Sequence, residues 1–396
     1  MKHARRCWPI AITLCVLFLS CLMWYKVKDY GAKMSQDFRL RERPRENRTD
    51  GDGKDKKEVV FVLILAHYRS GSTYLSEVFN SNPEAFFVFE PILGIEKKLQ
   101  TEKYAASVGE HWNSTKTQKG VHKISKSSWN SSVTLVLENI FRCRLNELPD
   151  EVIRSQFMMT KSRRHEGYSK CVAQNMEDCI TLLTKICLAS KIRTIKVIRL
   201  HGKNDILMYL MRTYPNLRLL KLVRDPRGII VSRKRLGKRN KSYEQLSVHL
   251  CREMELDICN YIDVFESYPG RVMKIVYEDM AENPYQSIED IYSFLHQPIQ
   301  EDMVRAVLAM SSAKSEGWVY GTDRSDSTRT AYAWKWRLTP DSTRRIDGLC
   351  TVVYHYAGYC RLRHDRQLWN HKDKLRVRGG GISAKEACMK NAGSHI

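Results

Sequence analysis

Residues 59–73 decide the fold, and they read VVFVLILAHYRSGST. The first seven of them are apolar and rich in β-branched side chains, which is typical of a strand buried on both faces of a parallel sheet. A tight loop follows, and a helical pattern begins at Thr73. A strand, loop and helix in this order aim backbone N–H groups and a helix N-terminus at a phosphate. We therefore expect a phosphate-binding loop made of Arg69, Ser70, Gly71, Ser72 and Thr73.

The loop keeps the spacing of the Walker pattern GxxxxGK[ST] but changes two of its residues. Ala66 stands at the first glycine, and Ser72 stands where a lysine would reach the β- and γ-phosphates of a nucleoside triphosphate. The cation has moved to Arg69. Such a loop suits one 5′-phosphate without the groups that hold a triphosphate and its metal. An ordinary Gly/Ser turn between a strand and a helix is the alternative at this point.

Further apolar runs and helical patterns alternate along the chain. The runs that predict strands are 86–89, 193–200, 217–223 and 272–277, and the patterns that predict helices are 73–79, 203–214, 242–268, 284–295 and 302–310. Strands that alternate with helices predict an α/β fold with a central, mainly parallel sheet. Together with the loop, they favour a P-loop-like nucleotide-binding fold.

A second polar motif follows the run 217–223. Residues 220–233 read LKLVRDPRGIIVSR, in which the proline suits the first turn of a helix. Arg224 would then end a strand, and Ser232 would lie on the next helix. Both can converge on a second phosphate, because ligands of open α/β sheets bind at the carboxyl ends of the strands. Taken alone, the motif favours the alternative that Arg224 and Asp225 form a structural ion pair.

The N-terminal segment predicts a membrane anchor. Residues 1–7 contain three Lys and Arg, and residues 8–24 contain no charged side chain. A helix over this run spans about 26 Å, slightly less than a bilayer core of about 30 Å. The basic flank places the N-terminus in the cytosol, and no small-x-small cleavage site follows, so we favour an uncleaved anchor over a signal peptide. We expect a cytosolic tail at 1–7, a transmembrane helix at 8–25 and a luminal remainder.

Composition agrees with a luminal globular domain. The chain has 396 residues, and 66 Lys and Arg against 44 Asp and Glu give a net charge of +22. That charge favours a polyanionic partner, and the luminal topology excludes nucleic acid. Residues 26–58 are polar and predict a flexible stem, 59–369 predict the globular domain, and 370–396 predict a loose basic tail.

Cysteines and glycosylation motifs agree with the secretory pathway. Nine cysteines follow the predicted anchor, and none of the chain's 12 forms a CxxC pair. An oxidising lumen favours disulfides, and an odd number leaves at least one cysteine free or intermolecular, with the pairing open. The N-x-S/T sequons are Asn47, Asn113, Asn130 and Asn240.

Together, the two phosphate motifs resemble those of sulfotransferases that use 3′-phosphoadenosine 5′-phosphosulfate (PAPS). Residues 69–73 are similar to the form found in the Golgi carbohydrate 6-O-sulfotransferases, and 223–227 with 232–233 resemble the family's 3′-phosphate motif. Three more segments resemble the same family, at 89–91, 277–284 and 320–337. Departures are His67 and Tyr68, where smaller residues are expected, and Gly228, where alanine is usual.

This resemblance implies transfer of a sulfuryl group from PAPS to a sugar hydroxyl, without a metal. Arg69 and the N–H groups of 71–73 would hold the 5′-phosphate and stabilise the leaving group, while Arg224 and Ser232 would hold the 3′-phosphate. Glu90 is the expected general base, because the family has a carboxylate there and the run before it predicts apolar surroundings. The alternative for Glu90 is a carboxylate that caps a turn.

The resemblance also implies a partner and a compartment. The acceptor would be a glycan of keratan or chondroitin type on a glycoprotein or proteoglycan, sulfated at C6 of galactose, N-acetylglucosamine or N-acetylgalactosamine, in the Golgi membrane. Residues 100–170 fit no clear element and are interpreted as an insertion that faces the acceptor. The alternatives are a Golgi glycosyltransferase, whose DxD motif would have to be Asp50-Gly51-Asp52 in the predicted stem, and an inactive glycan-binding relative.

Overall fold

The computed structural model describes residues 58–98, 126–171, 175–236, 241–313, 322–370, 372–377 and 388. The predicted cytosolic tail, anchor and stem all lie outside these residues except for Glu58. Among the described residues, no helix has both the length and the apolar character needed to cross a membrane.

Five parallel strands form the central sheet. They are β1 (Val60–Leu65), β2 (Ala85–Phe89), β3 (Ile192–Val197), β4 (Leu217–Val223) and β5 (Val272–Val276), in the order β2-β3-β1-β4-β5. Each pair is parallel, so the predicted α/β fold with a parallel sheet is confirmed. The chain moves from β1 toward one edge and from β4 toward the other, which opens a crevice between the carboxyl ends of these two strands. In this class of fold, ligands bind in that crevice.

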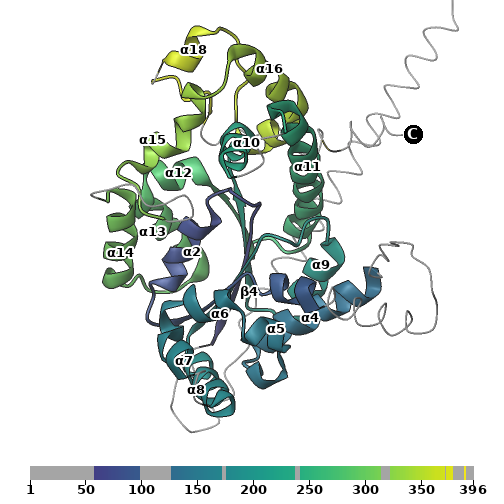
Figure 1. Cartoon of the computed structure of the whole chain (residues 1–396), viewed down its shortest axis with the longest axis vertical. Helices are drawn as coiled ribbons and strands as arrows, with labels where there is room; N and C mark the ends of the chain where they lie inside the picture. Colours follow the sequence, from purple (N-terminus) through teal and green to yellow (C-terminus); the bar gives the residue numbers. More distant parts are fainter. Residues whose placement is uncertain are drawn as a thin grey trace, which may run out of the picture. The chain divides into compact units, whose positions relative to one another are not determined.

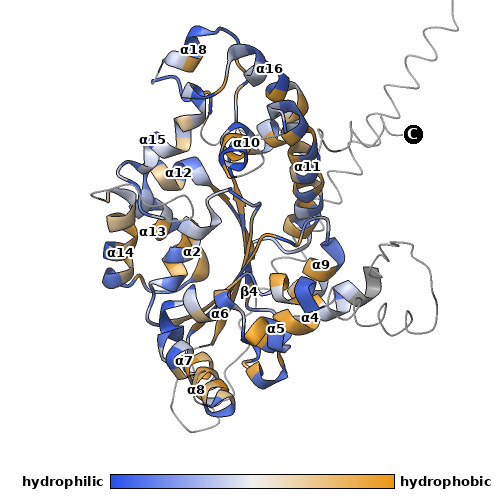
Figure 2. Cartoon of the chain, in the orientation of Figure 1, coloured by the Kyte–Doolittle hydropathy of each residue, from blue (hydrophilic) through white to orange (hydrophobic). Residues whose placement is uncertain are grey.

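Helices cover both faces of the sheet, which Figure 1 shows nearly edge-on. Side chains alternate along each strand, so Val62 and Ile64 face one helical layer while Leu63 and Leu65 face the other. One layer contains α2 (Ser72–Asn80), α12 (Tyr277–Glu282), α13 (Pro284–Leu295) and α14 (Glu301–Ser311). The other contains α4 (Lys126–Phe141), α8 (Met176–Leu188), α9 (Asn204–Thr213) and α11 (Tyr243–Ser267). In Figure 2, hydrophobic residues gather in the central strands, while α11 also carries many hydrophilic ones.

Local sequence signals set several helix ends. Ser242 and Gln245 form a reciprocal capping box at the start of α11, and Asp225 caps α10 (Pro226–Arg235), whose first residue is proline. The remaining described helices are α5 (Asp150–Ile153), α6 (Gln156–Thr160), α7 (Glu166–Cys171), α15 (Ser327–Tyr332), α16 (Pro340–Leu349), α17 (Thr351–Ala357) and α18 (Arg366–Trp369), with 3-10 turns at Leu145–Glu147, Arg163–His165 and Ala333–Trp336.

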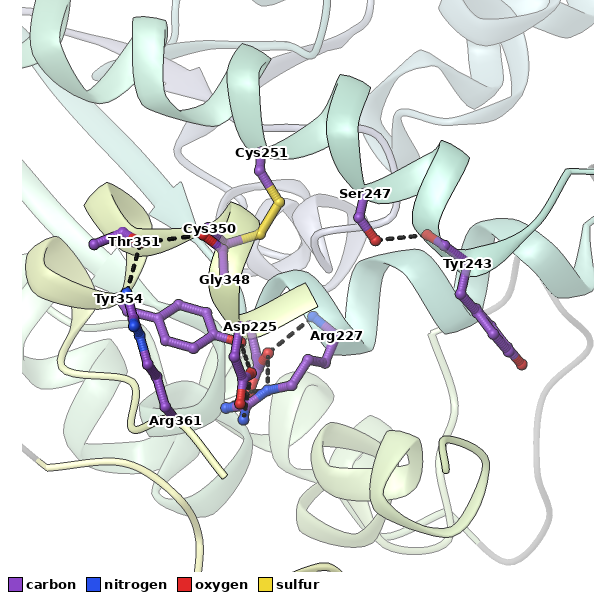
Figure 3. Close-up of a disulfide and its surroundings, with 11 residues drawn as sticks. Asp225, Arg227, Tyr243, Ser247, Cys251, Gly348, Cys350, Thr351, Tyr354 and Arg361 are labelled. Atoms are coloured by element: carbon purple, nitrogen blue, oxygen red, sulfur yellow. Dashed lines mark hydrogen bonds and ion pairs between the residues drawn. A yellow bond between two sulfur atoms is a disulfide. The ribbon is translucent and has the colours of Figure 1, made fainter. Parts of the chain in front are cut away.

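A third apolar cluster extends the fold beyond the carboxyl edge of the sheet. It joins α10 and the first half of α11 to α16 and α17. The disulfide between Cys251 and Cys350 ties α11 to this region, as Figure 3 shows. The C-terminal helices therefore pack against the same strand ends that the crevice uses.

Four disulfides are present among the described residues. They pair Cys143 with Cys187, Cys171 with Cys179, Cys251 with Cys350, and Cys259 with Cys388. Cys360 is the free cysteine of this part of the chain, which confirms the prediction that at least one is unpaired within it. Of the four sequons, Asn130 alone falls within the described residues. It lies on α4 and donates its amide to Asp205.

The interpretation of 370–396 as a loose tail is wrong for residues 372–377. Arg376 pairs in a β-bridge with Tyr359 and forms an ion pair with Asp279. Leu375 is buried in the third apolar cluster. The basic composition of the segment did not indicate that one buried leucine and one ion pair would hold it against the domain.

Candidate active site

A cavity of about 1300 Å³ opens at the carboxyl edge of the sheet. Pockets that hold small molecules are typically about 300–1,000 Å³, so this one has room for a nucleotide and part of a second substrate. Among the described residues that line it, nine are Lys or Arg and one, Glu90, is acidic. A cavity with this balance of charge attracts anionic ligands.

The phosphate loop forms one wall of the cavity. Gly71 has a φ of 89° and caps the N-terminus of α2, a conformation that glycine adopts without strain. A Cβ atom on Gly71 would lie 2.2 Å from the Tyr277 ring, so no other residue fits. Arg69, Gly71, Ser72 and Thr73 line the cavity. The Ser70 hydroxyl instead donates to the carbonyl of His67 over 2.7 Å and shapes the loop from within.

The two predicted phosphate motifs meet directly. Arg69 donates from Nε to the hydroxyl oxygen of Ser232 over 3.0 Å, and Arg224 donates to the carbonyl of Arg69 over 3.2 Å. The Arg224 guanidinium lies over the Tyr277 ring, with its carbon 4.2 Å from the ring centre. Its Nε atom is buried without a hydrogen-bond partner among the described residues, which fits a missing anionic ligand. The two motifs that the sequence predicts thus contact each other at one cavity.

The alternative that Arg224 pairs with Asp225 is wrong. Asp225 instead accepts from Arg227, whose side chain is fully buried and also reaches Asp347, and Figure 3 shows the Asp225–Arg227 pair beside the Cys251–Cys350 disulfide. Burial alone would lower the pKa of Arg227, but the nearby Asp225 outweighs it and raises that pKa. Because Asp225 is occupied in this way, Arg224 faces the cavity.

The predicted segment 277–279 has two distinct roles. Tyr277 lines the cavity and contacts both phosphate motifs, which the sequence interpretation missed. Glu278 is fully buried and accepts hydrogen bonds from the Asp225 N–H and the Tyr359 hydroxyl. Burial and the neighbouring Asp225 carboxylate raise the pKa of Glu278 to about 7. Glu278 therefore has a structural role, whereas Tyr277 lines the cavity.

Glu90 lies in the cavity, but the expectation of apolar surroundings is wrong. Its two carboxylate oxygens contact the Lys196 ammonium and, at 2.6 Å, the Arg199 guanidinium. Lys196 is almost completely buried, and burial lowers its pKa to about 8 despite the attraction of Glu90. These cations come from β3 and the residues after it, next to β2 in the sheet. The carboxylate binds side chains from a neighbouring strand rather than capping the turn.

Strained backbone marks both residues for which we predicted a catalytic role. Arg69 has a φ of 71° and Glu90 a φ of 49°, and only three other described non-glycine residues have positive φ. Each such conformation costs about 1–3 kcal/mol and is found where the surrounding structure enforces it, often at functional sites.

Several lining residues were not named as site residues from the sequence, although some of them lie in the family-like segment 320–337. Helix α6 contributes Gln156 and Phe157, and Lys161 follows it, all within the region that we left unassigned. Arg324 and Arg329 come from the segment before and within α15, and Trp334 and Trp336 from the 3-10 turn after it. The residues of α6 had no such signal, because tertiary packing alone brings that helix to the cavity.

Comparison with known proteins identifies the family. The model of the sulfotransferase family matches residues 62–301. The chain belongs to the sulfotransferase family. The prediction that the protein is a sulfotransferase is therefore confirmed. The predicted resemblance to carbohydrate sulfotransferases is confirmed by the relatives described next.

Relatives of this sulfotransferase include named carbohydrate enzymes. Carbohydrate sulfotransferase 1 of Rattus norvegicus is 26% identical over 341 residues, which cover 78% of this chain and 81% of the relative. Carbohydrate sulfotransferase 3 of Homo sapiens is 21% identical over 365 residues, which cover 79% of this chain and 70% of the relative. Among solved structures, mouse sulfotransferase SULT7A1 complexed with PAP is 14% identical, covers 76% of this chain and 86% of its own, and has a TM-score of 0.39.

One cluster bears on the prediction that no metal takes part. Among the described residues, His67, His201 and Asp257 bring potential ligand atoms within 4.8 Å of one another. These three residues are far apart in the sequence, so their spacing does not show this proximity. Lys221 also contacts the Asp257 carboxylate, with its ammonium 3.0 Å from Oδ2. These residues are absent from the lining of the large cavity.

Proposed function

We propose that this sulfotransferase moves the sulfuryl group of PAPS to the C6 hydroxyl of galactose, N-acetylglucosamine or N-acetylgalactosamine. The acceptor is an anionic glycan of keratan or chondroitin type, carried by a glycoprotein or proteoglycan in the Golgi. The observation that carries the proposal is the direct contact of Arg69 with Ser232 and of Arg224 with Arg69 at one cavity. Names of the carbohydrate relatives support the acceptor class.

The two motifs divide the donor between them. Arg69 and the start of α2 hold the 5′-phosphate, because a helix N-terminus and a guanidinium both favour an anion. Arg224 and Ser232 hold the 3′-phosphate, and the unpartnered Nε of Arg224 supplies one donor. A nucleotide without a 3′-phosphate has no group that can bind Arg224 and Ser232. The two phosphate motifs together therefore select a 3′,5′-bisphosphate.

Transfer needs a base on the other side of the cavity. When bound, PAPS supplies a sulfuryl group whose bond to the 5′-phosphate oxygen breaks as the acceptor oxygen bonds to sulfur. Glu90 receives the proton of the acceptor hydroxyl, since each of its oxygens has a lone pair beyond the one that its cation occupies. Lys196 and Arg199 hold this carboxylate in place, and Arg69 stabilises the negative charge that forms on the 5′-phosphate.

The acceptor side of the cavity favours an anionic sugar chain. Lys161 directly after α6, Arg324 in the segment before α15 and Arg329 on α15 itself line it. These cations exceed what one nucleotide bisphosphate requires. A glycan with uronates or existing sulfates can pair with them, which raises both its affinity and its rate of encounter at low salt.

Sulfate transfer with a defined acceptor panel tests this function. The full-length protein in detergent is incubated with PAPS labelled in the sulfuryl group and with desulfated keratan and chondroitin chains. Arg224→Ala serves as the control for donor binding. We expect label in one glycan class, at C6 by disaccharide analysis, and at least a tenfold lower rate in the control. Binding of adenosine 3′,5′-bisphosphate without transfer to any glycan would contradict the acceptor assignment, and displacement of the donor by UDP would favour a glycosyltransferase.

A further inference from the structure

A buried polar cluster lies behind the phosphate loop, on the face of the sheet that α11 covers. Its centre is the Asp257 carboxylate of α11, 7% exposed. Oδ2 lies 2.6 Å from His201 Nδ1, 3.0 Å from Lys221 Nζ and 3.1 Å from His67 Nε2, and Oδ1 accepts from the Gly202 N–H over 2.8 Å. One side chain thus gathers groups from the ends of β1, β3 and β4.

The cluster is better explained as a charge-balanced anchor than as a binding site. The adjoining cavity measures about 20 Å³, enough for roughly one water molecule. The Lys221 ammonium already supplies a cation at the oxygen that a metal would need. Burial alone would raise the pKa of Asp257, but Lys221 and the two histidines outweigh it and hold that pKa well below its usual range.

His67 connects this cluster to the loop. Its ring is 2% exposed and stacks on the His201 ring, with centres 4.2 Å apart and planes 11° from parallel. Burial lowers the pKa of His67 to about 3, so the ring is neutral at neutral pH. Its Nε2 lies close to Asp257 without the alignment of a hydrogen bond, and its Nδ1 has no partner among the described residues. Asp257 is therefore the one polar contact that fixes the ring.

The backbone of His67 holds the turn that presents Arg69. The His67 carbonyl accepts from the Ser70 N–H over 3.1 Å and from the Ser70 hydroxyl over 2.7 Å. Arg69 lies between these residues with positive φ, a conformation that the turn must enforce. A shift of the His67 ring would relax this turn and move the Arg69 side chain away from Ser232.

We propose that Asp257 is a positioning residue that acts through His67 to hold the phosphate loop in its 5′-phosphate-binding shape. This inference rests on the proposed function. Asp257 does not line the large cavity, and His67 connects it to the loop that does. The 3′-phosphate side is built by Arg224, directly after β4, and by Ser232 on α10. Among the described residues, His67, His201 and Asp257 form no hydrogen bond or ion pair with Arg224 or Ser232; the two sides of the site meet where Arg69 contacts both residues.

Two single-phosphate nucleotides separate this role from a general structural one. Binding of adenosine 5′-phosphate and adenosine 3′-phosphate is measured by calorimetry on the full-length protein and on His67→Met, which keeps the volume but loses the polar contact. We expect affinity for the 5′-phosphate to fall by about tenfold, as for loss of a buried polar contact, and affinity for the 3′-phosphate to stay within about twofold. Asp257→Asn should shift the same ratio.

Matched variants make the result decisive. His67→Gln returns a donor group near the position of Nε2 and should recover most of the 5′-phosphate affinity. Asp263→Asn, on the exposed side of the same helix, should change neither affinity. An equal loss of both affinities in His67→Met, or no loss, would overturn the positioning role. Failure of the unaltered protein to bind either nucleotide would instead reject the proposed donor, and with it the basis of this inference.

Discussion

Two buried carboxylates lie at the same edge of the sheet, and their surroundings are closely alike. Glu90 is 8% exposed and Asp257 is 7% exposed, and each pairs with a lysine from a central strand. The difference is what lies beside them. Glu90 lines a cavity of about 1300 Å³, whereas Asp257 adjoins one of about 20 Å³. Burial and ion pairing therefore do not distinguish the carboxylate that we propose to react from the one that we propose to hold the loop, whereas access to the cavity does.

The largest expected effect concerns Glu90, the carboxylate that lines the large cavity. Glu90→Gln removes the proton acceptor but keeps the shape, so turnover should fall by about 10²–10⁴-fold. The dissociation constant of adenosine 3′,5′-bisphosphate should stay within about threefold of the unaltered value, because neither phosphate motif is touched. Rates at saturating donor and calorimetric titration measure the two quantities. Unchanged turnover would remove Glu90 from catalysis.

A smaller effect extends the comparison to two arginines. Arg224 lines the cavity, whereas Arg227, three residues later in the sequence, is fully buried and does not line it. Arg224→Ala should weaken bisphosphate binding by about 2–4 kcal/mol, through loss of a charge-assisted contact in a dry site. Arg227→Ala should instead destabilise the fold by about 3–5 kcal/mol, because it leaves Asp225 and Asp347 buried without their cation. Titration and thermal denaturation test the pair, and interchanged outcomes would contradict the assignment.

The pH dependence of turnover sharpens the role of Lys196. Its pKa in the folded protein is about 8, below the ordinary value of 10.5, so the ammonium beside Glu90 is lost as the pH rises through 8. Turnover should then fall by about tenfold between pH 8 and pH 9.5. Lys196→Arg keeps its charge in this range and should remove that alkaline limb. A limb that persists in the variant would assign it to another group.

The lowered pKa of Lys196 affects stability in the opposite direction from turnover: as the pH rises, turnover should fall while the free energy of unfolding should increase. The unfolded chain binds the Lys196 proton more tightly than the folded one between pH 8 and 10.5. Across that interval, Lys196 therefore contributes more to the stability of the folded state as the pH rises. Falling activity with rising stability from one residue would distinguish loss of a catalytic charge from alkaline unfolding.

The smallest expected effect concerns the residue where family members usually carry alanine. A Cβ on Gly228 would lie 3.2 Å from the Nε of Arg224, a tight contact that a flexible side chain can relieve. Gly228→Ala should therefore change the bisphosphate dissociation constant by less than about threefold. Gly71→Ala is the matched contrast, since its Cβ would meet the Tyr277 ring at 2.2 Å with a φ of 89°. Comparable losses in both variants would show that Arg224 has no room to move.

Sequence reasoning found the elements that have strong local signals. Strand β4 begins and ends where its apolar run predicts, and helix α13 where its helical pattern predicts. Arg69, Arg224 and Glu90 all line the cavity. It misjudged the surroundings of Glu90, because Lys196 is 106 residues away in the sequence and meets it only through strand pairing. The role of Tyr277 was missed for the same reason, because it meets Arg224 through packing of segments that are distant in the sequence. The Asp225–Arg227 pair is local, and it was missed because the sequence does not say which neighbouring arginine turns toward Asp225. Local patterns report periodicity and caps, whereas side-chain partners depend on which strands become neighbours.

Helix α11 carries two of the four disulfides, at Cys251 and Cys259, on either side of Asp257. Their partners lie 99 and 129 residues later in the chain. At translation rates of about 5–20 residues per second, the second bond can close only some 6–26 s after Cys259 is synthesised. Throughout that interval the partner of Cys259 in the folded protein is not yet synthesised, and Cys360, which is free in the folded protein, precedes Cys388 in the chain. We therefore expect Cys360 to compete for Cys259 during synthesis, and a disulfide isomerase to raise the yield of active protein.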